Sequence, residues 1–343
     1  MRVFLGPLRV FSPLSSTANA CLLVPTRRSL YSKRGIPTVS ALSQALQESK
    51  TYLASTEAMA SITRDPYWPK WDSPWWHMML LFELDLAHEI PKSTVEKMVA
   101  TLKTHYLPIF PIRQEEVPEC TDPHRQIACL CAVGNMYQVL FACGVDVDKE
   151  LPWMRDWFLR YQLPDGGLNC DERVYTKSEP KSSIVTTIAC LEAVLFCRNR
   201  ELTDEETAFL NRGARYLLRQ RLFRKVSTGE VIDSDWLEIR FPRFYEYDFL
   251  RGFYFLRKWQ QASGLEVPGD LVDEVDQLVA RQWDGKSIVL KRYNLFDKRS
   301  LNPQADGSWA WGQANEFTHM TAVSYQGATC PALTTKWLEI RRQ

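Results

Sequence analysis

The stretch Gln162-Leu163-Pro164-Asp165-Gly166-Gly167 decides the expected fold, because it ends an amphipathic helix in a tight Asp-Gly turn. Similar helices end at Gln220 and Gln282, at successive spacings of 58 and 62 residues. Another ends at His105, 57 residues before Gln162. Two helices fit into each interval. A repeat of this length and content predicts helical hairpins that stack side by side rather than independent folds.

The two helices of each expected pair differ in character. The first helices are apolar nearly all round, and they are expected over residues 75–88, 125–143, 182–197 and 247–262. The second helices have one polar face, and they are expected over residues 93–106, 149–162, 204–222 and 271–283. In a closed ring of hairpins, inner helices contact neighbours on all sides while outer helices meet water. The sequence therefore predicts an all-α fold, a two-layer α/α toroid of five to six hairpins, with an open superhelix as the alternative.

Shorter elements flank these pairs. A helix of good helix formers is expected over residues 42–63, and two later helices over 316–325 and 333–342. Only residues 287–290 and 308–311 have an extended pattern. Thr203 with Glu206 forms a capping box, Ser73 with Pro74 is a helix start, and Gly144 is a helix stop.

The first 40 residues differ in composition from the rest of the chain. They contain six basic residues and no acidic one, and we interpret them as an untranslated leader or disordered extension from an upstream start codon; the composition also matches a mitochondrial transit peptide, which is the alternative. We expect a leader over residues 1–40 and a single toroid domain over residues 41–343. The expected location is cytoplasmic, with the mitochondrion as the alternative.

Composition excludes several classes of protein. The 343-residue chain is 45% hydrophobic and 24% charged, as in ordinary soluble proteins, and no stretch is long and apolar enough to span a bilayer. Beyond residue 40 acids outnumber bases by five, so no nucleic-acid partner is expected. Nine cysteines without paired spacing indicate a reducing compartment. Five of them lie in apolar stretches and are interpreted as small hydrophobic residues, namely Cys129, Cys131, Cys143, Cys190 and Cys197.

The helix endings carry a resemblance to a known superfamily. Gln162–Gly167 and Gln304–Trp309 are similar to the Gln-x-x-Asp-Gly-Gly and Gln-x-Asp-Gly-Ser-Trp endings of the squalene/hopene cyclase and protein prenyltransferase superfamily. The likeness covers roughly residues 75–330. Leu168 stands where that pattern has Trp, and the second ending is one residue short. The resemblance implies an α/α toroid around a hydrophobic pocket, acting on an isoprenoid or another apolar substrate.

In a toroid the loops that lead into the inner helices gather at one mouth of the ring. Here those loops are rich in aromatic and polar residues, the usual composition of a ligand site. Taken singly, each such residue is also explained as a helix cap or as core. The candidate substrate-binding residues are Trp71, Asp72, Trp75, Trp76, His77, His124, Arg125, Lys181, Ser182, Arg243, Tyr245, Tyr247 and Arg251.

A terpene cyclase would need an activated carboxylic acid that protonates an alkene. Asp233 and Asp235 lie in Asp-Ser-Asp-Trp, which lacks the final Asp of the cyclase motif, and solvated loop acids are the alternative interpretation. Asp248 is another candidate acid, and His319 is a further candidate catalytic residue. Aromatic faces in the mouth would stabilise a carbocation.

A protein prenyltransferase would need zinc, and two residues here offer ligands for it. Cys170 and Asp171 are adjacent, in the reverse of that family's order, and would need a histidine such as His319, His124 or His77. We expect Cys170 to be an exposed loop thiol, with zinc binding as the alternative, and we expect no cofactor.

A third hypothesis involves no catalysis. The ring would bind a lipid, a sugar or a peptide. The anion site for a phosphate or carboxylate would then be formed by His124, Arg125, Lys181, Arg243 and Arg251. An aspartate at 233 or 235 that faces the cavity would favour cyclisation over binding.

Overall fold

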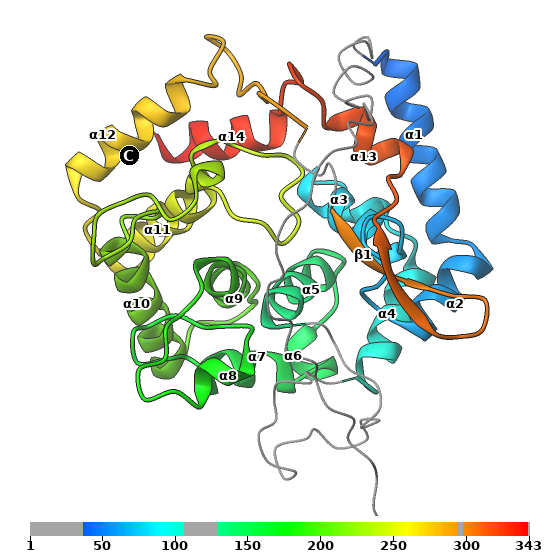
Figure 1. Ribbon diagram of the computed structural model, residues 1–343, viewed down its shortest axis with the longest axis horizontal. Coiled ribbons are helices and arrows are strands. Elements are labelled where there is room, and N and C mark those ends of the chain that lie inside the picture. Colours follow the sequence, from blue (N-terminus) through cyan, green and yellow to red (C-terminus); the bar gives the residue numbers. More distant parts are fainter. Residues whose placement is uncertain (1–36, 106–128, 294–297, 342–343) are drawn as a thin grey trace, which may run out of the picture. The chain divides into compact units, whose positions relative to one another are not determined.

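The computed structural model describes residues 37–105, 129–293 and 298–341, which contain fourteen α-helices and one antiparallel pair of strands (Figure 1). The prediction of a mainly helical chain is confirmed. A compact unit begins at Thr38. None of the helices in the described ranges has the length and apolar character needed to cross a membrane.

Five helices form a row of neighbours in chain order. They are α3 (Pro74–Glu83), α5 (Leu130–Ala142), α9 (Ile184–Phe196), α11 (Phe249–Ser263) and α14 (Pro331–Ile340). Each contacts the next one in this order, and Figure 1 views α5 and α9 nearly along their axes. Eleven of the 13 residues of α5 are buried, as expected for a helix enclosed on all sides.

A second helix follows most members of this row and has one exposed face. These helices are α4 (Lys92–Leu102), α7 (Trp153–Arg160), α10 (Asp204–Arg219) and α12 (Gly269–Ala280). α10 packs against both α9 and α11, and α12 packs against α11. Only four of the 12 residues of α12 are buried. The predicted alternation of enclosed and half-exposed helices is therefore confirmed.

Some predicted boundaries were wrong for local reasons. The helix expected over residues 42–63 is two helices, α1 (Val39–Leu53) and α2 (Thr56–Arg64), because the Ser55 side chain caps a new start by accepting the Ala58 N–H at 3.1 Å. Pro152 separates α6 (Val147–Glu150) from α7, where a single helix was expected. The capping box of Thr203 and Glu206 is confirmed.

The remaining elements are short. They are α8 (Glu172–Tyr175), α13 (Thr318–Val323), the 3-10 turns η3 (Ala87–Glu89) and η5 (Ser234–Leu237), and the strands β1 (Arg299–Pro303) and β2 (Trp309–Gln313). β1 was not predicted, and the Gln304–Ser308 segment is the turn of this hairpin. α13 packs against α1.

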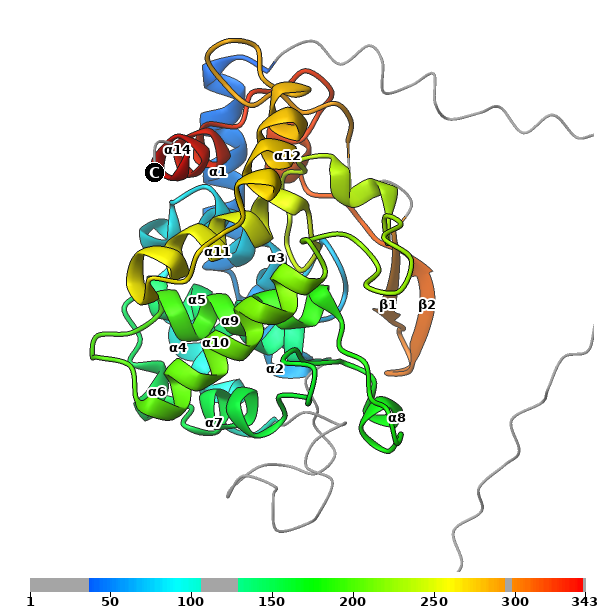
Figure 2. The same ribbon diagram turned by 90° about the vertical axis from the view of Figure 1, so that its left-hand side faces the viewer.

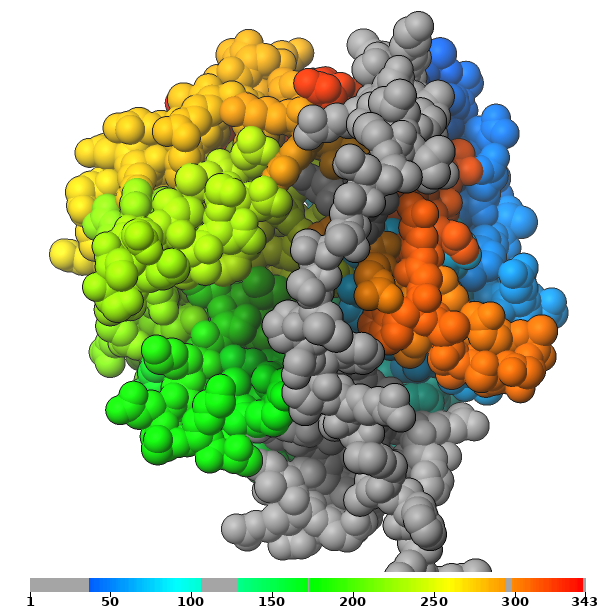
Figure 3. Space-filling model, in the orientation of Figure 1, coloured from blue at the N-terminus to red at the C-terminus, as the bar shows by residue number. Residues whose placement is uncertain are grey.

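The two ends of the α5–α9 pair carry different segments. Figure 2 shows β1, β2 and α8 beyond one end of these helices, and α6 beyond the opposite end. In the space-filling view the β-hairpin and the loop segments near residues 165–180 and 225–245 lie on the face toward the viewer (Figure 3). The N-termini of α5 and α9 therefore lie toward the hairpin, and their C-termini lie toward α6.

The glutamines of the repeat hold the helix ends together. The Gln162 side chain donates to the carbonyls of Gly166 at 2.7 Å and Phe209 at 2.9 Å. Gln282 bonds both the N–H and the carbonyl of Ile239, at 2.7 and 3.1 Å. Gln162 thus connects its helix ending to the next repeat, and Gln282 connects its own to the loop before α11, which is a structural role rather than a chemical one.

Candidate functional site

A cavity of about 340 Å³ lies between the C-terminal halves of α3, α5 and α9, with α11 and α14 completing its wall. Its apolar surface is mostly aromatic and includes Phe82, Phe141, Phe196, Phe244 and Tyr254. Five charged side chains also line it, namely Glu83, Glu192, Arg243, Arg251 and Lys336. An apolar hollow with a few charged groups is the usual form of a small-molecule site.

The two carboxylates of this wall are already engaged. Glu83 accepts the backbone N–H groups of Arg243 at 2.7 Å and Phe244 at 2.5 Å, and this fixes the loop that leads into α11. Burial raises the pKa of Glu83, and the positive charge of Arg243 offsets part of that rise. Glu192 accepts hydrogen bonds from the guanidinium of Arg251 at 2.6 and 3.0 Å. Both carboxylates therefore already accept hydrogen bonds from the protein.

Arg251 is fully occupied as well. Besides Glu192, its guanidinium donates to Asn135 Oδ1 at 2.9 Å and to the carbonyls of Phe244 and Glu246 at 3.3 and 3.0 Å. Each of its three nitrogens therefore has an acceptor, and a buried guanidinium in this state is stabilising only while all of them remain. Arg251 was predicted to bind substrate; it lies on the cavity wall, but as a brace between α5, α9 and α11.

Two other cations on the wall lack such partners. Nη1 of Arg243 lies 3.7 Å from Asp248 Oδ1, which is too far for a hydrogen bond. Nζ of Lys336 has no hydrogen-bond acceptor within the described ranges, and its nearest aromatic ring, Tyr254, is centred 6.0 Å away. Burial, followed by the charge of Arg243, lowers the pKa of Lys336. Arg243 and Lys336 are therefore the side chains of the cavity wall that still have N–H donors for a ligand.

Asp248, one of the candidate catalytic acids, has a structural role. Its side chain is fully buried and caps α11, accepting the N–H groups of Arg251 at 2.9 Å and Arg240 at 3.2 Å. It does not line the cavity.

Asp233 and Asp235 do not line the cavity either. Both are exposed: Asp233 caps the start of η5 by accepting the Asp235 N–H at 2.9 Å, and Asp235, within η5, pairs with Arg292 at 2.8 Å. Neither aspartate faces the cavity, so the arrangement that would have favoured cyclisation is not found.

His77 and His319 lie together, away from the cavity. Nδ1 of His77 is 3.0 Å from Ser49 Oγ, and its ring stacks on Phe317 with centroids 3.7 Å apart. Nδ1 of His319 is buried without a hydrogen-bond partner. Burial, and for His77 also the charge of His319, lowers their pKa values to about 3 for His77 and about 4 for His319. Both rings are uncharged parts of the core between α1, α3 and α13.

The predicted aromatic residues mostly form core. Trp71, Trp75, Trp76 and Tyr247 are buried, and Trp71 stacks on Phe244 at 5.1 Å. Tyr245 is half-buried beside them.

The predicted polar residues of the mouth are scattered. Asp72 accepts a hydrogen bond from Asn315, Ser182 bonds to Asp165, and Lys181 is exposed. His124 and Arg125 lie outside the described residues. Among the predicted residues that the structure describes, only Arg243 and Arg251 line the cavity.

Three cysteine sulfurs converge at the opposite end of α5. The sulfurs of Cys129, Cys131 and Cys170 lie within 4.8 Å of one another, with Cys129 and Cys131 only 2.8 Å apart. Hydrogen bonds from the other two thiols hold the pKa of Cys170 well below its ordinary value. These residues could hold a metal ion.

This cluster corrects two sequence interpretations. Cys129 and Cys131 were interpreted as small hydrophobic residues, although the Cys-x-Cys spacing directly before an apolar helix is a signal that could have found them. Cys170 was expected to be an exposed loop thiol, with zinc bound by Cys170, Asp171 and a histidine as the alternative, and it is half-buried. Asp171 instead pairs with Arg173 at 3.0 Å, and no histidine of the described residues joins the group.

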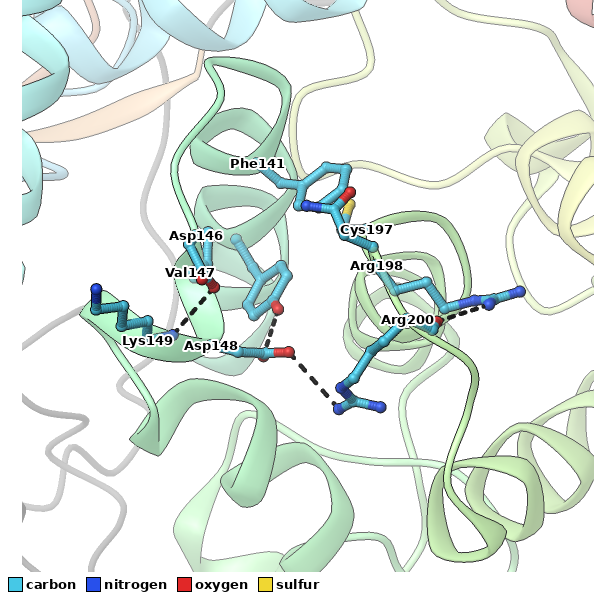
Figure 4. Close-up of a pocket in the computed structure, with 10 residues that line it drawn as sticks. Phe141, Asp146, Val147, Asp148, Lys149, Cys197, Arg198 and Arg200 are labelled. Atoms are coloured by element: carbon cyan, nitrogen blue, oxygen red, sulfur yellow. Dashed lines mark hydrogen bonds and ion pairs between the residues drawn. The ribbon is translucent and has the colours of Figure 1, made fainter.

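A second hollow, of about 410 Å³, adjoins the cavity at the C-terminal ends of α5 and α9 (Figure 4). Phe141 and Cys197 line both hollows. Asp148, which accepts from Tyr137 at 2.5 Å and pairs with Arg200 at 3.6 Å, crosses this second hollow. Asp148 in this hollow is thus shared between Tyr137 and Arg200.

Comparison with known proteins found no matching family model, curated protein or solved structure.

Proposed function

We propose that the protein is an α/α toroid whose central cavity binds an apolar molecule with one anionic group, in the chemical class of fatty acids and isoprenoid phosphates. The observation that carries this proposal is the unpaired ammonium of Lys336 on an aromatic wall. The toroid is supported by the two ends of the helix row, since α3 and α14 line the same cavity.

An anionic group is favoured by the state of the charges. Glu83 and Glu192 act electrostatically on Lys336, but within the described ranges neither forms a hydrogen bond or a close ion pair with it, because their oxygens are bonded to Arg243, Phe244 and Arg251. The oxygens of Asp248, the acid nearest to Arg243, are occupied by backbone N–H groups. Lys336 is half-buried and Arg243 has only the distant pair with Asp248, so a carboxylate or phosphate would offer charge-assisted hydrogen bonds to both cations.

The rest of the wall favours an apolar body on the ligand. Phe82, Phe141, Phe196 and Tyr254 supply most of the surface that faces the cations. A cavity of about 340 Å³ falls at the lower end of the range for small-molecule sites, which suits one chain of modest length. We propose binding rather than cyclisation, because Asp233 and Asp235 are exposed and Asp248 caps a helix.

The Lys336→Gln variant is expected to bind decanoate about 10-fold more weakly than the natural chain. Loss of one hydrogen bond to a charged group removes about 1.5 kcal/mol or more, and about 1.4 kcal/mol corresponds to a factor of ten in Kd. Isothermal titration calorimetry with decanoate, decanol and decyltrimethylammonium would measure this. Decanoate should bind best to the natural chain, and the cationic probe should not bind.

Lys92→Gln is the matched control, because Lys92 is exposed on α4, far from the cavity lining, and pairs with Glu96. It should leave decanoate binding unchanged. Equal affinity for decanol and decanoate, or an unchanged Kd in a folded Lys336→Gln protein, would contradict the proposal.

A further inference from the structure

Cys129, Cys131 and Cys170 form a group that the central cavity does not use. Cys129 and Cys131 come from the start of α5, and Cys170 comes from the loop after the Gly166-Gly167 turn. We propose that this group binds one Zn²⁺ ion through three thiolates. The site is independent of the proposed anion-binding cavity, which lies at the other end of α5.

The geometry suits a metal ion better than a disulfide. A disulfide would join two sulfurs at about 2.05 Å and leave the third one unused. The 2.8 Å between Cys129 and Cys131 is longer than that bond. Tetrahedral zinc with Zn–S distances of about 2.3 Å holds its sulfurs about 3.8 Å apart, so a separation of these two by about 1 Å would admit the ion. Small rotations of two side chains achieve this.

The surroundings of the sulfurs resemble a second coordination shell. Thr186 Oγ1 lies 3.0 Å from the sulfur of Cys170. The backbone N–H groups of Ala132 and Cys131, in the first turn of α5, donate to the sulfurs of Cys129 and Cys170 respectively. N–H donors at a helix N-terminus stabilise thiolates, the form of cysteine that binds metals.

The charge balance favours Zn²⁺ over Cu⁺. Three thiolates with Zn²⁺ carry one net negative charge, and with Cu⁺ they carry two. One cation is near the group, because Lys70 interacts electrostatically with Cys129 and Cys131. Its Nζ is held by Tyr245 Oη at 2.8 Å and lies 4.5 Å from the centre of that ring. A single ammonium neutralises the zinc complex but not the copper complex.

The test is the metal content of the full chain, purified under reducing conditions without a chelator. Inductively coupled plasma mass spectrometry should find close to one zinc ion per chain. Anaerobic replacement by Co²⁺ should give the intense thiolate-to-cobalt charge-transfer absorption of a tetrahedral sulfur site. Cys170→Ser should weaken zinc binding about 100-fold or more, because even a second-shell change costs about 10- to 100-fold.

Cys143→Ser is the matched control, since Cys143 is a half-buried thiol at the other end of α5 and lies outside the group. It should keep its zinc and its cobalt spectrum. Cys170 is on a half-buried loop, so its variant is expected to fold, and circular dichroism would check this. A natural chain without metal and without the cobalt spectrum, a chain loaded with copper, or a disulfide between Cys129 and Cys131 in the reduced preparation would overturn the proposal. Decanoate binding would be unaffected by any of these results.

Discussion

Gly134→Ala is expected to lower the free energy of unfolding by about 3 kcal/mol, at the upper end of the usual cost of overpacking. Gly134 lies in α5 where this helix packs against α9. A Cβ atom there would lie 2.7 Å from the Ala189 carbonyl carbon and 2.9 Å from the Cys190 nitrogen. These are backbone atoms, which cannot rotate away as a side chain can, so the two helices would have to separate.

The higher helix propensity of alanine acts in the opposite direction, but its effect is smaller. Alanine within a helix is more favourable than glycine by roughly 0.5–1 kcal/mol, because glycine loses more backbone entropy on folding. The clash therefore decides the sign. Gly269→Ala is the matched control: Gly269 is the first residue of α12, and a Cβ atom added there would have no neighbour within 4 Å. That variant should be as stable as the natural chain or more so.

Urea denaturation followed by circular dichroism would measure both variants. If Gly134→Ala unfolds at the same urea concentration as the natural chain, the close contact between α5 and α9 is wrong. The cavity wall would then be in doubt too, because residues of both helices form it.

The helix pattern was readable from the sequence because it depends on local chemistry. Apolar character all round marked α5 and α9, and the capping box at Thr203 marked the start of α10. The break between α1 and α2 was missed because Ser55 lies in a run of good helix formers. β1 was missed because its pairing with β2 across the Gln304–Ser308 turn outweighs its weak strand pattern.

The candidate site was only partly readable because it joins distant segments. Arg243 and Arg251 were named as anion-binding residues, and both line the cavity. Lys336 was missed, since a single lysine in the last helix has no local feature that places it on a cavity wall. Whether Arg251 has free donors depends on Glu192 and Asn135, which come from two other helices. No local pattern contains that information.

A strong loss of stability is expected as the pH falls from 6.5 toward 4, because His77 and His319 are buried without charge. Their pKa values in the folded chain are about 3 and about 4, against 6.5 for an unperturbed histidine. Above pH 6.5 both histidines are uncharged in the folded and in the unfolded chain, so their protonation does not reduce the free energy of unfolding. Below pH 6.5 only the unfolded chain binds the two protons, so the folded state is disfavoured progressively until the folded pKa values are reached. Each histidine should remove about 3 kcal/mol between pH 6.5 and 4.

His319→Leu should reduce this pH dependence by about half, because it removes one of the two protons that drive it. The change breaks no hydrogen bond at Nδ1, which has no partner. His88→Gln is the control, since the His88 side chain is 69% exposed and its replacement should leave the pH dependence unchanged. Urea denaturation at pH 7, 6 and 5 gives the slope, and nuclear magnetic resonance titration of the imidazoles gives the two pKa values. An imidazole that titrates near 6.5 in the folded chain would show that water reaches the space between α1, α3 and α13, and the acid sensitivity would then need another source.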